Sequence, residues 1–302
     1  MFKTFIAIAA ATVSLCAGAQ VVSVRSIDKV PMTGLAVNIA RVSPDGTFAV
    51  ASSNDDNSLY TVNLSNGQTS RLQAEGSALE LSFSPDGSAI VYKSSTMKSG
   101  HLRYYSVKTL DLSKGNVRSL TAESRHCPSF SVSPMGVLSM NEKGRHSAKS
   151  LSGASTSAAQ AVVGINRGHL EVTVPGGKSK FIDPQGEGSY LWPSLSPDGK
   201  KIVYYLVGAG CFTCNLDGSD VRPLGYVHAP RWLNNNVVVG CQDYDNGSYI
   251  TSSTIVATDM SGNIQALTGP DVIGINPSAT ADGSAVLFST PAGELYVITL
   301  NK

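Results

Sequence analysis

The stretch Ser84-Pro85-Asp86-Gly87, followed by the apolar run Ile90-Val91-Tyr92, decides how this 302-residue chain is organised. Proline presets the backbone for the first central position of a type I turn, aspartate suits the second, and glycine takes the left-handed conformation that closes a short hairpin. The four residues therefore predict a tight turn between two strands. The turn recurs at 43–46 and 196–199, and in weaker form at 133–136, 233–236 and 280–283.

The spacing of these turns predicts the size of a repeating unit. The positions equivalent to Gly87 are 46, 87, 136, 199, 236 and 283, so successive turns lie 41, 49, 63, 37 and 47 residues apart. A unit of about 40–50 residues with short alternating strands is the size of one propeller blade. The sequence therefore predicts an all-β, six-bladed β-propeller of four-stranded antiparallel blades.

The two chain ends complete this prediction. The last unit supplies only three strands and ends at 294–300, whereas Val21–Ile27 precedes the first unit as an unassigned strand. We expect Val21–Ile27 to pair with Leu295–Leu300, so that the last blade closes the ring without leaving an exposed sheet edge. Residues 144–160, rich in Ser, Ala and Gly, lie in the longest gap, and we interpret them as an exposed insertion in the third blade.

Residues 1–19 have the features of a secretory signal peptide. Lys3 precedes the apolar stretch Phe5–Leu15, and Ala17-Gly18-Ala19 is a small-residue cleavage site before Gln20. We expect cleavage after Ala19, a single domain over 20–302 and export to the periplasm. Loss of Lys3 would leave 22 basic and 22 acidic side chains, a balance that favours neither nucleic acid nor anionic lipid as a partner. No other stretch is apolar and long enough to span a membrane.

Four cysteines follow the predicted cleavage site: Cys127, Cys211, Cys214 and Cys241. Cys211 and Cys214 form a C-x-x-C motif, but they lie on a predicted strand, where residues three apart point to opposite faces. No helix N-terminus is predicted beside them to activate a thiolate. We therefore expect packed cysteines rather than a redox pair, and a disulfide of Cys241 with Cys211 or with Cys214 remains open.

The Ser-Pro-Asp-Gly units resemble the WD40-like (PD40) repeats of the TolB family of exported bacterial propellers, and also the propeller of the prolyl-oligopeptidase family. The TolB resemblance implies a six-bladed ring used for protein–protein contact in the cell envelope. The peptidase resemblance implies no activity here, because the chain contains no G-x-S-x-G nucleophile motif.

Candidate binding residues follow from the expected arrangement of the loops. If the Pro-Asp-Gly turns occupy one face, the loops before the inner strands and after the second strands share the other, around the channel mouth. Convergent polar and aromatic groups at a concavity are the usual sign of a binding site. Trp232 is excluded because the strand register makes it a core residue. The candidates are His126, Tyr190, Trp192, His228, Asp243 and Tyr244.

These features predict a non-enzymatic, TolB-like binding or scaffold protein. The expected partner is an envelope protein or peptide, a weak glycan ligand is compatible with the channel, and we assign no catalytic residue, metal or cofactor. The alternative is a metal-assisted glycan lyase or hydrolase at the same mouth, because His126 and His228 each stand two residues before a proline. That activity would need their Nε2 atoms to converge within about 4–5 Å.

One further motif resembles the start of a calcium loop. Asp243-Tyr244-Asp245-Asn246-Gly247 has the D-x-D-x-G pattern, but its twelfth position is Thr254 rather than a carboxylate. Asn-Gly is a strong hairpin signal by itself. We therefore favour a plain turn over a calcium site.

Overall fold

The computed structural model describes residues 20–55, 57–133, 136–141, 143, 145–153, 160–174 and 177–301. The expected signal peptide, the centre of the turn at 133–136 and residues 154–159 lie outside the described residues. Cleavage after Ala19 therefore stays a prediction.

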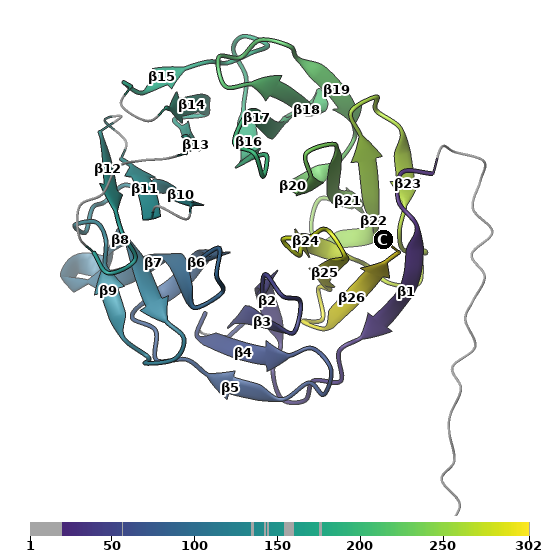
Figure 1. Cartoon of the computed structure of the whole chain (residues 1–302), viewed down its shortest axis with the longest axis horizontal. Coiled ribbons are helices and arrows are strands. Elements are labelled where there is room, and N and C mark those ends of the chain that lie inside the picture. Colours follow the sequence, from purple (N-terminus) through teal and green to yellow (C-terminus); the bar gives the residue numbers. More distant parts are fainter. Residues whose placement is uncertain are drawn as a thin grey trace, which may run out of the picture.

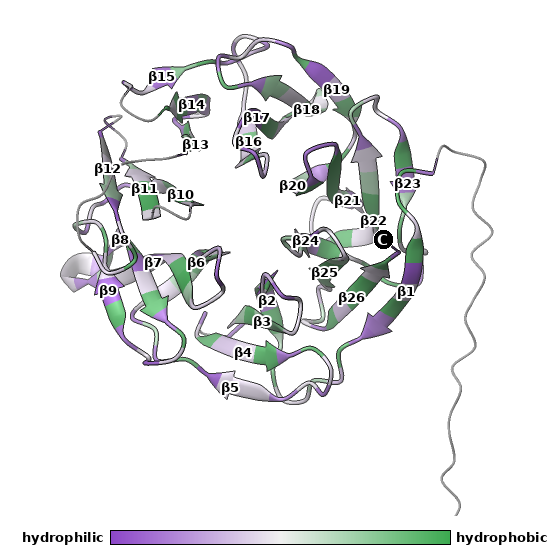
Figure 2. Ribbon diagram, viewed as in Figure 1, coloured by the Kyte–Doolittle hydropathy of each residue, from purple (hydrophilic) through white to green (hydrophobic). Residues whose placement is uncertain are grey.

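The described residues form seven antiparallel sheets arranged in a ring around a central opening (Figure 1). The described part of the chain contains no α-helix, and its one 3-10 turn is η1 (Ser99–His101). Hydrophobic residues concentrate in the strands and polar residues in the connecting loops (Figure 2). The first three sheets are, in order, β2 (Val37–Val42), β3 (Phe48–Ser53), β4 (Leu59–Asn63) and β5 (Thr69–Arg71); β6 (Ser77–Phe83), β7 (Ala89–Lys98), β8 (Leu102–Asp111) and β9 (Val117–Ser119); and β10 (Ser129–Ser133), β11 (Gly136–Met140) and β12 (His146–Lys149).

The remaining four sheets follow the same inner-to-outer order, except that the last one borrows a strand from the N-terminus. They are β13 (Val162–Asn166), β14 (His169–Thr173) and β15 (Lys180–Phe181); β16 (Tyr190–Leu195), β17 (Lys201–Leu206), β18 (Gly210–Asn215) and β19 (Arg222–Gly225); β20 (His228–Asn234), β21 (Val237–Asp245), β22 (Ile250–Asp259) and β23 (Ile264–Ala266); and β24 (Ile275–Ala279), β25 (Ala285–Ser289), β26 (Leu295–Leu300) and β1 (Val24–Lys29).

The predicted count of six units is wrong, because the long gap in the repeat contains two sheets. The third and fourth sheets have three strands each, so residues 144–160 are not one insertion: they include β12. The hairpin of β13 and β14 in the fourth sheet could not be recognised from the repeated motif, because its turn has a different sequence. Asn166 pairs with His169, and the two residues between them, Arg167 and Gly168, both have positive φ (54° and 87°). Such a two-residue turn needs no Pro-Asp-Gly.

The inner strand of the fourth sheet runs opposite to its neighbour. Ser131 Oγ of β10 donates to Ala161 O at 2.8 Å, whereas the earlier residue Ser129 lies against the later residue Gly164. Four antiparallel strands bring the chain back to the face of the ring at which the sheet began, whereas three strands end at the other face. The third sheet therefore ends at the other face, and the three strands of the fourth sheet bring the chain back. We call the face at which β16 and β20 begin the mouth face. Tyr190 N donates to Gly168 O at 3.1 Å, so the Arg167 turn lies on the mouth face.

The two chain ends pair as the sequence predicts. Strand β1 runs antiparallel to β26, with Ile27 opposite Ile298, and completes the seventh sheet. The strand begins at Val24 rather than at Val21, because Gln265 of the sixth sheet holds the preceding residues. Gln265 Oε1 accepts hydrogen bonds from Val21 N and Val22 N at 2.7 and 2.9 Å. The N-terminal segment therefore ties the sixth sheet to the seventh.

The serine of the repeated turn has a role that the turn rules alone do not give. Ser84 Oγ donates to Asp86 Oδ1 at 2.6 Å and accepts from Ala89 N at 3.0 Å, while Gly87 adopts the expected positive φ of 71°. The hydroxyl thus joins the turn to the first residue of the next strand. The same two bonds recur at Ser43, Ser196 and Thr280.

The core lies between neighbouring sheets, and three of the cysteines are buried in it. Cys211 and Cys214 are both fully buried, in two different apolar clusters on opposite faces of the fifth sheet. Cys241 is buried in a third cluster, and all four described cysteines are free thiols. Burial raises the pKa of the Cys241 and Cys214 thiols to about 12, so both stay protonated. Trp232 is 8% exposed, which confirms that it is a core residue.

Candidate functional site

Bulges at the mouth ends of the inner strands position the candidate residues. The register of β16 shifts between Leu191 and Ser194, and that of β20 shifts after His228. Trp192 and Ala229 have positive φ (49° and 47°), and each precedes a proline that cannot donate to the ladder. A bulge re-aims the side chains around it. As a result Trp192 leaves the core and is 39% exposed.

Five rings come together where the fifth and sixth sheets meet. The His228 ring lies 4.4 Å from both Tyr205 and Tyr226, and 5.5 Å from Trp192, measured between centroids. Tyr244 stacks on Tyr226 at 6.2 Å with an interplanar angle of 21°. We call Trp192, Tyr205, Tyr226, His228 and Tyr244 the aromatic cluster.

A His–Asp pair fixes the centre of the aromatic cluster. Nδ1 of His228 contacts Oδ1 of Asp243, and the two side chains are only 17% and 19% exposed. This contact and the neighbouring rings of Tyr205 and Tyr226 restrain the orientation of the imidazole. The hydroxyl of Tyr226 donates to the backbone carbonyl of Asp243 at 3.3 Å. These contacts connect β20, β21 and the loop before β20 into one rigid support.

Three rings of the aromatic cluster are open to solvent. Tyr244 is 63% exposed, Tyr226 is 41% exposed and Trp192 is 39% exposed, whereas Tyr205 is buried beneath them. Burial raises the pKa of Tyr205 and of Tyr226, so both hydroxyls stay protonated at neutral pH. The arrangement is a neutral aromatic surface whose rings are already ordered.

Four of the six candidates therefore meet in one place: Trp192, His228, Asp243 and Tyr244. Tyr190 does not belong to it. Its side chain is fully buried against the fourth sheet, and its hydroxyl donates to Gly186 O at 2.9 Å and accepts from Gln185 N at 3.1 Å. Tyr190 precedes the bulge, whereas Trp192 lies in it, which explains why only Trp192 turns outward. Tyr205 and Tyr226 were not among the binding residues predicted from the sequence, although Tyr226 lies only two residues before His228.

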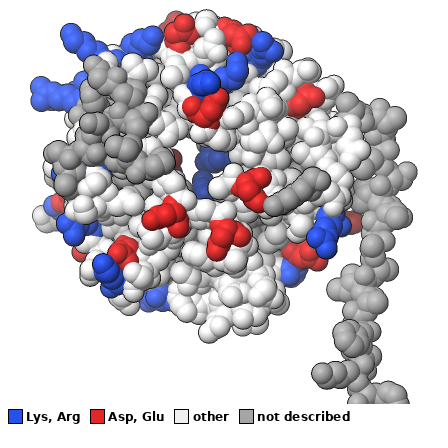
Figure 3. All heavy atoms as spheres, in the orientation of Figure 1, with Lys and Arg blue, Asp and Glu red and all other residues white. Residues whose placement is uncertain are grey.

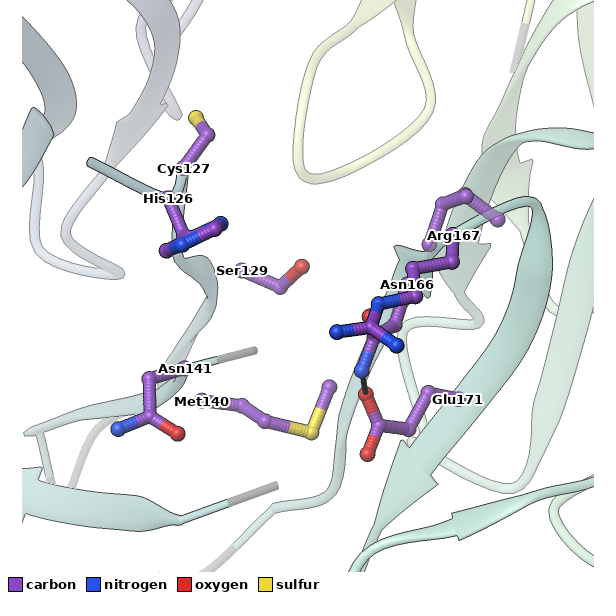
Figure 4. Close-up of a pocket in the computed structure, with 9 residues that line it drawn as sticks. His126, Cys127, Ser129, Met140, Asn141, Asn166, Arg167 and Glu171 are labelled. Atoms are coloured by element: carbon purple, nitrogen blue, oxygen red, sulfur yellow. Dashed lines mark hydrogen bonds between the residues drawn. The ribbon is translucent and has the colours of Figure 1, made fainter. Parts of the chain in front are cut away.

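His126 lies in a different site. It lines a cavity of about 330 Å³ between the third and fourth sheets, together with Cys127 and Asn141. Arg167, Asn166 and Glu171 form the opposite wall (Figure 4). Nδ2 of Asn166 donates to Glu171 Oε2 at 2.9 Å, and Ser179 Oγ donates to the other oxygen of the same carboxylate. The left-handed turn at Arg167 is what brings its guanidinium to this wall.

The metal and calcium interpretations gain no geometric support. His126 lies in the segment before the third sheet and His228 begins the inner strand of the sixth, with two sheets between them, so each imidazole belongs to a separate site. Within the described ranges no three His, Cys, Asp or Glu side chains are grouped to hold a metal ion. Asp245 Oδ1 accepts from Gly247 N at 2.8 Å within a hairpin turn, as the plain-turn interpretation predicts, while Asp243 is paired with His228.

Comparisons with solved structures define the class of the fold. A putative TolB from Agrobacterium tumefaciens is similar over 89% of this chain and 92% of its own, with 18% identity and a TM-score of 0.53. U3-55K is similar over 91% of this chain and 98% of its own, with 12% identity and a TM-score of 0.65. No protein-family model and no curated protein matches the sequence. The chain thus has the all-β fold of the TolB-like and WD40-like propellers, and similarity at this level shows the fold alone.

Among the described residues, no helix has the length and apolar character needed to cross a bilayer.

Proposed function

We propose that this protein is a non-enzymatic, exported binding propeller that holds an envelope protein or peptide on its mouth face. The observation that carries the proposal is the aromatic cluster: Trp192, Tyr226 and Tyr244 are exposed, adjacent and supported from below by the His228–Asp243 pair. The predicted signal peptide and the resemblance of the repeats to the TolB family support the periplasm as the location.

The physical reason is the cost of ordering a binding surface. Aromatic residues concentrate interface energy because each ring covers a large area and has few rotatable bonds. Here the rings contact one another in the free protein, so little further ordering is needed when a partner binds. We also infer that the seven sheets are the blades of one ring that β1 closes, which would keep the two sheets carrying the cluster in fixed register.

The test compares capture of partners by matched variants. Trp192→Ala and Tyr226→Ala should reduce capture from an envelope extract by the mature chain at least tenfold, because each removes an exposed ring. Phe181→Ala is the control, since Phe181 is 54% exposed but lies on β15 of the fourth sheet. Melting temperatures of all three variants should stay close to that of the wild type.

The outcome can reject either the site or the partner class. Undiminished capture by Trp192→Ala and Tyr226→Ala would reject the aromatic cluster as the binding site. Binding of oligosaccharides by the wild type, with no captured protein, would replace the protein partner by a glycan.

A further inference from the structure

The inner strands share one position that differs sharply in charge from blade to blade. This position lies two residues before the first residue of the repeated turn, and it occurs in six of the sheets. Four sheets have serine there and two have arginine. The residues are Ser82, Ser131, Ser194 and Ser278, and Arg41 and Arg231.

Both arginines place a guanidinium nitrogen on the open edge of an inner strand. The N–H and C=O groups of successive residues in a strand point to alternating sides. Ser43 N donates to Phe48 O of β3, so the N–H and C=O groups of Val42 and Ala40 point away from β3. Val42 N donates instead to Ser278 Oγ of the seventh sheet at 3.3 Å. Arg41 Nη1 donates to Ala40 O, on the same edge, at 2.9 Å. The Arg41 side chain thus lies over the edge that borders the central opening.

Arg231 repeats this arrangement in the sixth sheet. Its Nη1 donates to the carbonyl of the preceding residue, Pro230, at 3.1 Å, as Arg41 does to Ala40. Basic side chains are visible inside the central opening (Figure 3). Strand β24 separates β20 from β2, so Ser278 lies between the two arginines on three successive inner strands.

The carboxylate near these arginines does not neutralise them. Glu80 of β6 faces both, but its Oε2 is paired with Lys93 Nζ at 2.6 Å. In the described part of the chain neither Arg41 nor Arg231 takes part in an ion pair. Three cations and one carboxylate leave an excess of two positive charges.

The surroundings make this excess unfavourable in the free protein. Burial and repulsion from Arg231 lower the pKa of Arg41 to about 9, and burial lowers the pKa of Arg231. With a pKa of about 9 the Arg41 guanidinium remains protonated at neutral pH, and arginine side chains in proteins carry their charge at this pH in general. Two like charges that are half-buried close to one another are costly, and a counter-charge placed between them is correspondingly favourable.

We propose that the central opening binds a small oxyanion carrying two negative charges, held between Arg41 and Arg231. Each guanidinium presents paired N–H groups that match two oxygens of a phosphate or a carboxylate. The hydroxyl of Ser278 accepts from Val42 N and so has its own proton available for the same ligand. This site is independent of the aromatic cluster and of its partner.

The experiment measures binding of inorganic phosphate and of succinate by calorimetry and by thermal shift, at an ionic strength held constant with sodium chloride. The wild type should bind at least one of them saturably with a rise in melting temperature, and the tighter one identifies the ligand as a phosphate or a dicarboxylate. Arg41→Ser and Arg231→Ser should each weaken binding at least tenfold. Serine suits the test because four other sheets carry it at this position.

Arg103→Ser is the matched control, because it removes the same charge from the exposed start of β8. It should bind the anion as the wild type does. Arg41→Lys and Arg231→Lys keep the positive charge but lose the paired N–H groups of the guanidinium, and they should bind the anion weakly. If a serine variant fails to fold, the lysine variants provide the test. Absence of saturable binding to the wild type would overturn the proposal, as would serine or lysine variants that bind the anion as tightly as the wild type does.

Discussion

Replacing Ser84 by alanine tests how the repeated turn is joined to its blade. Ser84 is fully buried, and its hydroxyl is the acceptor for Ala89 N at 3.0 Å. Ala89 N and Ala89 O point to the same side, toward Ser84, because Ala89 O accepts from Ser84 N at 2.8 Å. In Ser84→Ala the Ala89 amide therefore loses its acceptor in a place that water does not reach.

The size of the effect follows from that lost acceptor. A buried amide without a partner costs about 1–3 kcal/mol. Asp86 loses one bond as well but keeps those from Ser88 N and Ser88 Oγ, at 3.1 and 2.9 Å. We expect the free energy of unfolding to fall by about 2 kcal/mol, and the melting temperature by about 4–8 °C.

Urea unfolding monitored by tryptophan fluorescence measures the change, with the midpoint shifting while the slope m stays constant. Ser88→Ala is the matched control, since Ser88 donates to the same carboxylate from an exposed position and should cost less than about 0.5 kcal/mol. Ser43→Ala and Ser196→Ala should reproduce the loss seen at Ser84. A cost for Ser84→Ala no greater than that for Ser88→Ala would refute the reasoning.

Three further predictions concern the core, the chain ends and acid. Phe288→Ala removes a ring that is 1% exposed and should lower the free energy of unfolding by about 3–5 kcal/mol, measured by urea unfolding with an exposed aromatic as control. Gln265→Ala should release the N-terminal segment, visible as at least tenfold faster amide exchange at residues 21 and 22 with little change in β21. The hydrogen bond from Ser84 holds the pKa of Asp86 below its usual value, so the stability that this carboxylate contributes is present above about pH 4 and is lost as the pH falls further. Thermal melts between pH 2 and pH 6 would show this fall, and Ser84→Ala should reduce its steepness.

The repeated turn determined most of the fold from the sequence alone. Proline, aspartate and glycine act on their own backbone, so their conformations can be read without knowing any distant contact. The confirmed pairing of β1 with β26 could also be predicted, because a last unit with three strands and a spare N-terminal strand have few other solutions. The opposite orientation of Cys211 and Cys214 followed from the period of a strand.

The tertiary structure decided the number of sheets and the composition of the site. The hairpin at Arg167 uses a two-residue turn without the motif, and its direction depends on how many strands precede it in the third sheet. Trp192 and Tyr190 are two residues apart, yet a bulge turns one outward while the other packs against the fourth sheet. Four rings of the aromatic cluster come from strands of two sheets and the fifth, Tyr226, comes from the loop between those sheets. Arg41 and Arg231 approach each other only because the ring brings the first and sixth sheets to the same central opening. Local chemistry fixes a turn, whereas proximity between blades exists only once the whole ring has formed.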